Sequence, residues 1–481
     1  MFEQTFKNID DAIWKDAGCD SELDYAEQSS WILFLKWLDD FEKEREIKAK
    51  LDNKDFKEIL EKKYRWSSWA FVKDKKGNID YDKTITGPDL TEFVNNELFP
   101  YLSNFKNKID DFNTIEFKIG IIFSELKNKI QDGYILRKVL NEVGTLQFKS
   151  DTEKHELSLL YESKIQNMGN AGRTGGQYYT PRPLITTIVK LINPKINETV
   201  YDGACGSCGF LVEAFNHIKE SKPLTTIEFK KLQSETLYGK EKKNIAYIIG
   251  LMNMILHGIE SPNLSKTNTL EENIMDFQSK DKFDVVLANP PFGAGELPQI
   301  QENFPIKSSE TAYLFLQHFI KKLKTGGRAG IIIKNTFLSN DDAKYLRKEL
   351  LETCELHTIL NLPQKVFTAG VRTVVLFFKK GNPTKKIFFY DLKLERNLGL
   401  TNPLNEKDLE EFVKLYNNKK DSLNSWFINI EDLDKKNWEL TVKNPNTVEE
   451  TDERTPIEIM SEIEKLKEEE TVILKKIKKL L

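Results

Sequence analysis

The pattern of apolar and polar positions divides the chain into three regions, and the first of them is helical. Residues 1–160 contain long periodic stretches, such as 22–44 and 114–129, whose spacing of apolar residues predicts amphipathic helices. The run Trp31–Leu35 is too short to span a bilayer and is interpreted as core packing. We therefore predict a helical N-terminal domain over residues 1–160.

In the second region, residues 161–400, short apolar runs alternate with helical segments. This alternation is typical of a parallel sheet with crossover helices, so an α/β fold is expected here. Thr373–Phe378 and Lys386–Tyr390 flank the turn signal Gly381-Asn382-Pro383 and predict an antiparallel hairpin that closes the sheet. The strands predicted before them are Thr199–Tyr201, Thr236–Tyr238, Phe283–Ala288 and Ala329–Ile333.

The third region, residues 401–481, is predicted to be helical and to bind a partner. Its last part has apolar residues at alternating spacings of four and three, with one polar interruption, which predicts a coiled-coil helix. Two alternatives remain open for this helix, namely docking on its own domain and pairing with another subunit. The positions of the stripe are Ile459, Ile463, Leu466, Glu470, Ile473, Ile477 and Leu480.

Charge and composition limit the classes of function. The chain has 71 Lys and Arg against 75 Asp and Glu, which gives a net charge of −4. Bulk positive charge therefore cannot hold a nucleic acid, and any basic surface must be local or supplied by a partner. No apolar run approaches the length of a membrane span, and the first residues lack a secretory pattern, so a cytoplasmic protein without a membrane partner is expected.

Cysteine and histidine usage argues against a metal site. Cys205 and Cys208 form a C-x-x-C pair, but zinc would need a second pair or nearby histidines. The five histidines are scattered singly along the sequence. No bound metal is therefore expected.

Two features that could bind a cofactor follow predicted strands. The turn from Asp202 to Gly209 is rich in small residues, so its backbone can approach a ligand closely, and Asp202 offers an acceptor for an amino group. Taken alone, such a turn is equally compatible with a tight strand-to-helix connection. Glu241 follows a second strand and could accept both hydroxyls of a ribose, although an ordinary surface glutamate is the alternative.

A third feature carries the reaction chemistry. The buried strand Phe283–Ala288 leads directly into Asn289, Pro290, Pro291 and Phe292. Prolines lack N–H donors, so this segment presents acceptors beside an aromatic ring. Acceptors that bind the two N–H groups of a planar amine favour its attacking geometry and stabilise the positive charge that develops on nitrogen. A Pro-Pro turn that merely ends a strand is the structural alternative.

These residues together resemble a known family. Asn289–Phe292, preceded by the Asp202–Gly209 turn, resembles the amino-group DNA methyltransferases with the gamma order of motifs. The segment Gly176–Arg182, of sequence GQYYTPR, resembles a segment of the modification subunits of type I restriction-modification systems. In that family it covers the methionine end of the cofactor.

The resemblance implies a Rossmann-like class I methyltransferase core, S-adenosylmethionine as cofactor, and methylation of the N6 amine of adenine in DNA by Asn289, Pro290, Pro291 and Phe292. Gly203 stands where proline is common, Cys208 where glycine or alanine is usual, and Asn268 where an aspartate is expected. The cofactor contacts implied are Gln177, Tyr178, Tyr179, Thr180, Pro181, Arg182, Asp202, Gly203, Ala204, Gly206, Ser207, Cys208, Gly209, Glu241 and Asn268.

The resemblance also implies partners. These are double-stranded DNA, a specificity subunit that reads the sequence, and a second copy of the chain, so that the complex methylates and protects host DNA. Whether a restriction or translocase subunit joins them is left open. Two alternatives also remain open, namely a methyltransferase acting on RNA or on protein glutamine, and a non-catalytic scaffold with the same fold.

Overall fold

The computed structural model describes most of the chain. Gln177 and Tyr178, two of the predicted cofactor contacts, lie outside the described residues. The described ranges are 2–77, 79–111, 114–146, 161–165, 179–260, 262–292, 295–367, 370–399, 401–446 and 455–480.

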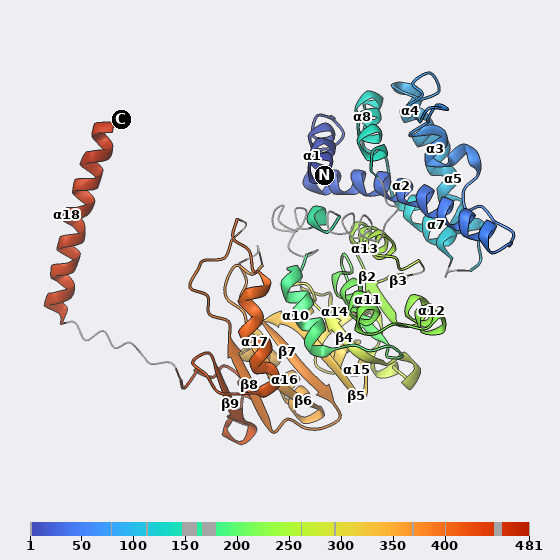
Figure 1. Cartoon of the computed structure of the whole chain (residues 1–481). Helices are drawn as coiled ribbons and strands as arrows, with labels where there is room; N and C mark the ends of the chain where they lie inside the picture. Colours follow the sequence, from blue (N-terminus) through green and yellow to red (C-terminus); the bar gives the residue numbers. More distant parts are fainter. Residues whose placement is uncertain are drawn as a thin grey trace.

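The described part of the N-terminal region is built of helices, as predicted, and it is drawn in blue and cyan (Figure 1). The Ser21 side chain accepts a hydrogen bond from Asp24 N and caps the longest of them, α2, whose run Trp31–Leu35 is fully buried in the helical core. The helices are α1 (Phe2–Ile13), α2 (Glu22–Leu51), α3 (Trp66–Trp69), α4 (Pro88–Phe93), α5 (Phe99–Ser103), α6 (Phe105–Lys108), α7 (Ile115–Glu125) and α8 (Gly133–Gly144).

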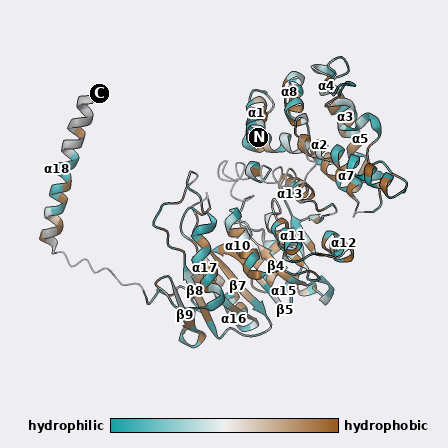
Figure 2. Cartoon of the chain, in the orientation of Figure 1, coloured by the Kyte–Doolittle hydropathy of each residue, from teal (hydrophilic) through white to brown (hydrophobic). Residues whose placement is uncertain are grey.

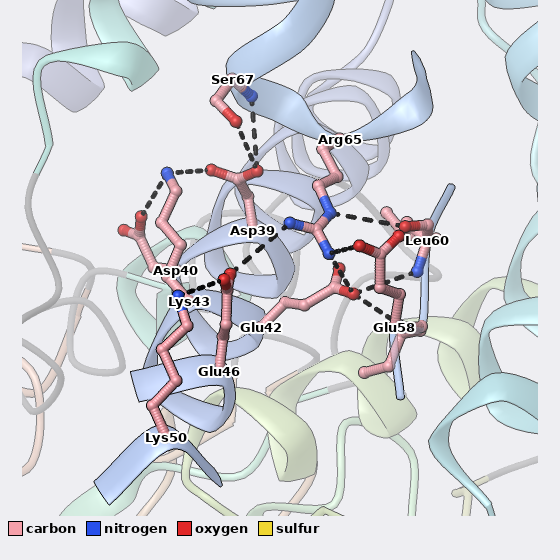
Figure 3. A network of polar contacts seen from close by, with 11 residues as sticks. Asp39, Asp40, Glu42, Lys43, Glu46, Lys50, Glu58, Leu60, Arg65 and Ser67 are labelled. Carbon is pink, nitrogen blue, oxygen red and sulfur yellow. Dashed lines mark hydrogen bonds and ion pairs between the residues drawn. The ribbon is translucent and has the colours of Figure 1, made fainter. Parts of the chain in front are cut away.

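A polar network fixes the connection between α2 and α3 (Figure 3). The buried carboxylate of Glu42 accepts hydrogen bonds from Ile59 N at 2.7 Å and from the Arg65 guanidinium at 3.1 Å. Arg65 also pairs with Glu58 at 3.2 Å. Both hydrogen bonds go to Oε1 of Glu42, and this oxygen ties the connection to α2, whereas the buried Oε2 has no hydrogen-bond partner among the described residues.

Within the described residues, nine strands form a single sheet in the order β3-β2-β1-β4-β5-β7-β6-β8-β9. The strands are β1 (Val200–Asp202), β2 (Leu237–Glu241), β3 (Asn263–Lys266), β4 (Phe283–Ala288), β5 (Leu323–Lys334), β6 (Cys354–Asn361), β7 (Thr373–Lys380), β8 (Lys386–Asp391) and β9 (Ser425–Asn429). The strands from β3 through β5 are all parallel, which confirms the expected α/β class.

The predicted hairpin of β7 and β8 is wrong. β6, which the sequence pattern did not reveal, lies between them and pairs antiparallel with β7 and parallel with β8. The turn at Gly381-Asn382-Pro383 crosses the start of β6, where Gly381 N donates to Thr353 O and Thr384 Oγ1 donates to Cys354 O. The antiparallel hairpin of the sheet is therefore formed by β6 and β7.

Helices cover both faces of the sheet, and alternate strand residues point into two cores. In β4, Val285 and Leu287 belong to the core shared with α10, α11, α13 and α17, whereas Val286 and Ala288 belong to the core beneath α15 and α16. Figure 2 shows the strands mostly in the brown of hydrophobic residues. The helices are α10 (Arg182–Ile192), α11 (Gly209–Ser221), α12 (Thr226–Ser234), α13 (Asn244–Leu256), α14 (Pro298–Gln301), α15 (Thr311–Lys322), α16 (Lys344–Thr353) and α17 (Glu406–Asn418).

The core extends past residue 400, so the predicted helical region over 401–481 needs correction. β9 pairs antiparallel with β8 along the sheet edge, and α17 packs on α10 through the core residue Phe412. The last helix, α18 (Pro456–Leu480), stands apart from the rest of the molecule (Figure 1).

Candidate active site

The predicted site residues gather at one edge of the sheet because three neighbouring parallel strands end there. β1 ends at Asp202 and β2 at Glu241, and β4 leads directly into Asn289. β1 lies between β2 and β4 in the sheet. The carboxyl ends of these strands form the crevice in which open α/β sheets bind ligands, at the point where the strand order reverses.

The turn after β1 is shaped by two carboxylates. Asp202 accepts a hydrogen bond from Ala204 N at 3.0 Å, and Glu241 accepts bonds from Gly206 N at 3.0 Å and from Lys243 N at 2.7 Å. Glu241 thus reaches across from β2 and fixes the turn of the neighbouring strand. Its two hydrogen bonds to backbone N–H groups distinguish Glu241 from a solvent-exposed surface glutamate.

Asp202 is 1% exposed. Burial raises the pKa of its carboxyl to about 8, and the neighbouring carboxylate of Glu241 acts in the same direction, while the hydrogen bond from Ala204 opposes it. A buried acid of this kind gains its negative charge most readily when a cationic or strongly donating group lies against it.

Helix α13 supports the turn from behind. The Asn253 amide donates a hydrogen bond from Nδ2 to Ser207 O at 2.8 Å, and its buried Oδ1 has no hydrogen-bond partner within the described part of the chain. Gly250 lies so close that a Cβ placed on it would stand 2.6 Å from Gly206 O and 2.7 Å from Cys208 Sγ. Cys208 itself has a left-handed φ of 65° and begins α11, so the C-x-x-C pair forms part of a tight turn.

The side chain of Asn289 is oriented by a residue from a distant part of the chain. Asn289 Nδ2 donates a hydrogen bond to Thr180 Oγ1 at 2.9 Å. This contact turns Oδ1 away from Thr180, and Oδ1 is buried without a hydrogen-bond partner among the described residues. Because a buried acceptor without a partner costs free energy, its persistence points to a ligand with an N–H group.

The aromatic ring after the two prolines is half-buried. Phe292 meets the buried Phe367 edge to face, with ring centroids 5.5 Å apart and an interplanar angle of 81°. Phe367 follows β6, and the segment Val366-Phe367 also fits the family resemblance. The contact with Phe367 orients the Phe292 ring, and part of that ring stays exposed.

The segment before α10 forms the wall opposite the turn. Pro181 is the N-cap of α10, and Arg182 pairs with Glu162 at 2.8 Å and with Glu213 at 2.9 Å. Burial raises the pKa of the Glu162 carboxyl to about 6, although the charge of Arg182 opposes the shift. Tyr179 packs against the core beside this ion pair.

A cavity of about 190 Å³ lies between this wall and the turn after β1. It is lined by Glu162, Ser163, Ile165, Tyr179, Thr180, Arg182, Ile185, Ser207, Gly209 and Asn253. Two of the predicted segments, around residues 180 and 207, thus meet at the cavity, and the hydrogen bond from Asn289 to Thr180 joins the third segment to them. Glu162 and Asn253 line the cavity but were missed, because neither belongs to a motif that stands out in a single sequence.

Asn268 has a structural role in this conformation. Its side chain accepts a hydrogen bond from Leu270 N and caps the short helical turn Thr269–Glu271. The next residue makes the contact to the site, since Thr269 Oγ1 donates to Gly203 O at 2.6 Å. Asn268 therefore lies next to a residue, Thr269, that contacts the turn after β1.

The groups present fit S-adenosylmethionine. Asp202 and Glu241 supply carboxylate acceptors for amino and hydroxyl groups, and the small residues between Gly203 and Gly209 let a ligand approach the backbone. The unpartnered buried oxygen of Asn253 beside the cavity is a further acceptor. Among the described residues, no cluster of three or more His, Cys, Asp or Glu side chains could hold a metal ion.

Comparisons with known proteins agree along most of the chain. A family model described as N-6 DNA Methylase matches residues 152–454, and one described as HsdM N-terminal domain matches residues 2–143. The methylase subunit of the type I restriction enzyme EcoEI from Escherichia coli is 36% identical over 455 residues, which cover 91% of this chain and 89% of that protein. The StySJI methylase subunit from Salmonella typhimurium is 29% identical and covers 82% of this chain and 72% of its own length.

Solved structures give the same result. A modification subunit from Vibrio vulnificus has a TM-score of 0.81 at 32% identity, covering 92% of this chain and 96% of its own. A chain from a study of complex assembly in the type I restriction-modification system has a TM-score of 0.78 at 34% identity. The match covers 100% of this chain and 98% of that one.

Among the described residues, no helix combines the length and the apolar character needed to span a membrane. With a family model over more than half of its length and a relative 36% identical along nearly all of it, this chain belongs to the N-6 DNA methylase family, as a type I methylase subunit that uses S-adenosylmethionine.

Proposed function

We propose that the chain transfers a methyl group to the N6 amine of adenine in double-stranded DNA and does so as the catalytic subunit of a larger complex that protects host DNA. The observation that carries this proposal is the buried Oδ1 of Asn289, which lies at the end of β4 and has no hydrogen-bond partner among the residues that the structure describes. Its position supports a substrate that brings an N–H donor to this edge of the sheet.

The proposed reaction depends on hydrogen-bond acceptors more than on a general base. The lone pair of the adenine amine is delocalised into the ring, so the amine is a weak nucleophile. Hydrogen bonds from its two N–H groups to Asn289 Oδ1 and to the Pro290 carbonyl would favour the pyramidal, attacking geometry. Both dipoles also stabilise the positive charge that develops on nitrogen. Thr180 is assigned as a positioning residue, because it orients the Asn289 amide at 2.9 Å.

Phe292 is proposed to stack on the target base, with Pro291 holding it in place. A base inside a duplex cannot reach the end of β4, so we expect the adenine to be turned out of the helix into the site. The edge-to-face contact with Phe367 at 5.5 Å supports a fixed orientation of the Phe292 ring.

S-adenosylmethionine supplies the electrophilic methyl group when it is bound. We assign Asp202 and Glu241 to bind its amino and hydroxyl groups, and the backbone of the turn from Gly203 to Gly209 to lie against it. Tyr179, Thr180 and Arg182 form the opposite wall, together with Glu162 and Asn253. For Gln177 and Tyr178 we propose the cofactor contacts that the family resemblance implies. We propose the same for Asn268, whose neighbour Thr269 contacts Gly203.

The partners are proposed from the relatives and from α18. The relatives are named as subunits of type I restriction enzymes, so a specificity subunit, a second copy of this chain and a restriction subunit are the expected partners. The stripe of α18 is exposed at Ile463 and Leu466, with 44% and 57% of each residue accessible. An exposed apolar stripe on a detached helix supports pairing with another subunit.

The substrate assignment is tested with the chain co-expressed with its specificity partner and supplied with cofactor carrying a labelled methyl group. Duplex DNA, structured RNA and total protein are offered separately, and each product is hydrolysed and separated by chromatography. We expect label in N6-methyladenine from DNA. Label in N4-methylcytosine, in RNA or in glutamine would overturn the assignment, and absence of both transfer and cofactor binding would favour the scaffold.

A further inference from the structure

A large groove continues the catalytic edge of the sheet beyond β4. It has a volume of about 870 Å³ and is lined by residues at the ends of β5, β6 and β8. Asn335 follows β5, Asn361 ends β6 and Asp391 ends β8, and all three line the groove. These strands run parallel to β4, with the antiparallel β7 between β5 and β6, so the groove opens on the same side as Asn289.

The charged side chains of the groove are mostly basic. Lys365, Arg372, Lys393 and Arg396 line it, against a single acid, Asp391. Arg396 pairs with Asp408 outside the groove lining, and the other three basic residues are exposed and form no ion pair among the described residues. This local surplus of positive charge contrasts with the net charge of −4 of the whole chain.

One loop links the basic residues to the reacting centre. Residues 362–372 connect β6 to β7, and they carry Phe367 between Lys365 and Arg372. Phe367 contacts Phe292 at 5.5 Å. Lys365 is two residues away, so its Cα lies within about 8 Å of that of Phe367. A base that is turned out of the duplex stays covalently joined to its sugar and phosphate, so a strand whose base contacts Phe292 brings its own phosphates towards this loop.

The lining also contains apolar residues, such as Leu338, Leu398 and Leu440, and its exposed polar side chains suit a sugar–phosphate backbone. Gln364 and Asn397 are exposed amides in the groove, and Asn335, which follows the end of β5, adds a third amide to the lining. Amide and basic side chains are the groups that most often contact phosphate and sugar oxygens, and such contacts fix the register of a strand without reading its sequence.

We propose that this groove binds the sugar–phosphate backbone of the DNA strand that carries the target base, with Lys365, Arg372 and Lys393 neutralising its phosphates. The inference rests on the proposed function, because it takes DNA as the substrate. It assigns to this chain a sequence-independent share of DNA binding, which explains how a subunit with negative net charge holds its substrate beside the catalytic residues.

The test compares two triple variants in the complex with the specificity partner. The first is Lys365→Gln, Arg372→Gln and Lys393→Gln. The matched control is Lys195→Gln, Lys219→Gln and Lys280→Gln, whose residues are also exposed but lie at the opposite edge of the sheet, before β1, at the end of α11 and before β4. The probe is a fluorescent duplex of random sequence, titrated by anisotropy at several salt concentrations, with cofactor binding measured in parallel.

For the groove variant we expect the slope of log K against log salt to fall by about 3, because each lost phosphate contact removes roughly one counterion. Affinity at low salt falls at least about tenfold, while the control variant and cofactor binding stay at the wild-type level. A groove variant with wild-type slope and affinity would overturn the groove assignment and leave adenine methylation standing. A wild-type complex that prefers RNA to DNA, or binds neither, would overturn both proposals.

Discussion

At the scale of single residues, the site depends on polar atoms whose partners lie far away in the sequence. Asn289 is oriented by Thr180, 109 residues earlier, and Glu241 reaches Gly206 in the turn of the neighbouring strand. The motifs around each residue could be predicted from the sequence because they are local patterns at strand ends. Their pairwise contacts could not, since they arise only when the parallel strands are aligned.

The hydrogen bond of Thr180 gives a first prediction. In Thr180→Val the amide of Asn289 loses its fixed orientation, so we expect kcat to fall by roughly five- to tenfold, as for a hydrogen bond worth about 1 kcal/mol. Thr180 also lines the cavity assigned to the cofactor, but valine keeps the volume of threonine, so the cofactor affinity should change less than kcat. Steady-state methylation of DNA by the complex measures both, and Thr180→Ser, which keeps the hydroxyl, should restore kcat. A Val variant as fast as wild type would show that the contact does not matter for the reaction.

A second prediction follows from the raised pKa of Asp202. The carboxyl of the free protein is largely protonated below about pH 8. A cationic cofactor prefers the carboxylate, so its binding releases a proton and its affinity rises with pH until the pH passes about 8. Calorimetry in buffers of different ionisation enthalpy measures this proton release. Asp202→Asn should bind more weakly and lose the dependence, whereas unchanged proton release in that variant would assign it to another group.

At the scale of elements, sequence patterns located the strands that are apolar and bounded by turns. Phe283–Ala288 is predicted with the bounds that β4 has in the structure. β6 was missed because Glu355, His357 and Asn361 interrupt its apolar pattern. The turn between β7 and β8 was recognised, but a turn signal carries no information about a third strand that inserts between its arms. β9 was hidden by the helical character of the residues around it.

The packing of α13 against the turn after β1 gives a third prediction. A Cβ at Gly250 would stand 2.6 Å from Gly206 O, so the backbone of the turn must shift in Gly250→Ala. Overpacking of this kind costs about 1–3 kcal/mol, and we expect at least a fivefold weaker cofactor affinity. Gly399→Ala is the matched control, because a Cβ there meets nothing within 4 Å. Equal affinities in isothermal titration of both variants would mean that the turn tolerates the shift.

At the scale of the whole molecule, the methyltransferase core and α18, the helix proposed to bind a partner, are separate. The core from α10 to β9 carries the cofactor turn, the catalytic loop and the basic groove on one edge of the sheet. Outside this core the structure describes the helical N-terminal region, residues 161–165, 179–181 and 430–446, and α18. The composition already indicated that basic surface must be local or supplied by a partner, because a chain with a net charge of −4 does not attract DNA by its overall charge.

Removal of α18 gives a fourth prediction. A chain truncated after Thr451 lacks the whole helix and its apolar stripe. We expect it to lose co-purification with the specificity partner, while its cofactor affinity stays within about twofold of wild type because α18 contributes no residue to the site. Size-exclusion chromatography of the co-expressed proteins makes the measurement. Continued co-elution of the truncated chain would place the partner's binding surface elsewhere.

The assignment of Asn289 as the catalytic acceptor is the central claim, and single-turnover methyl transfer tests it most directly. The complex is preloaded with labelled cofactor, mixed with duplex DNA, and the rate of N6-methyladenine formation is compared between wild type and Asn289→Ala. Loss of one preorganised transition-state contact predicts a rate lower by about 10²- to 10³-fold with cofactor affinity unchanged. Undiminished transfer by Asn289→Ala would contradict the account.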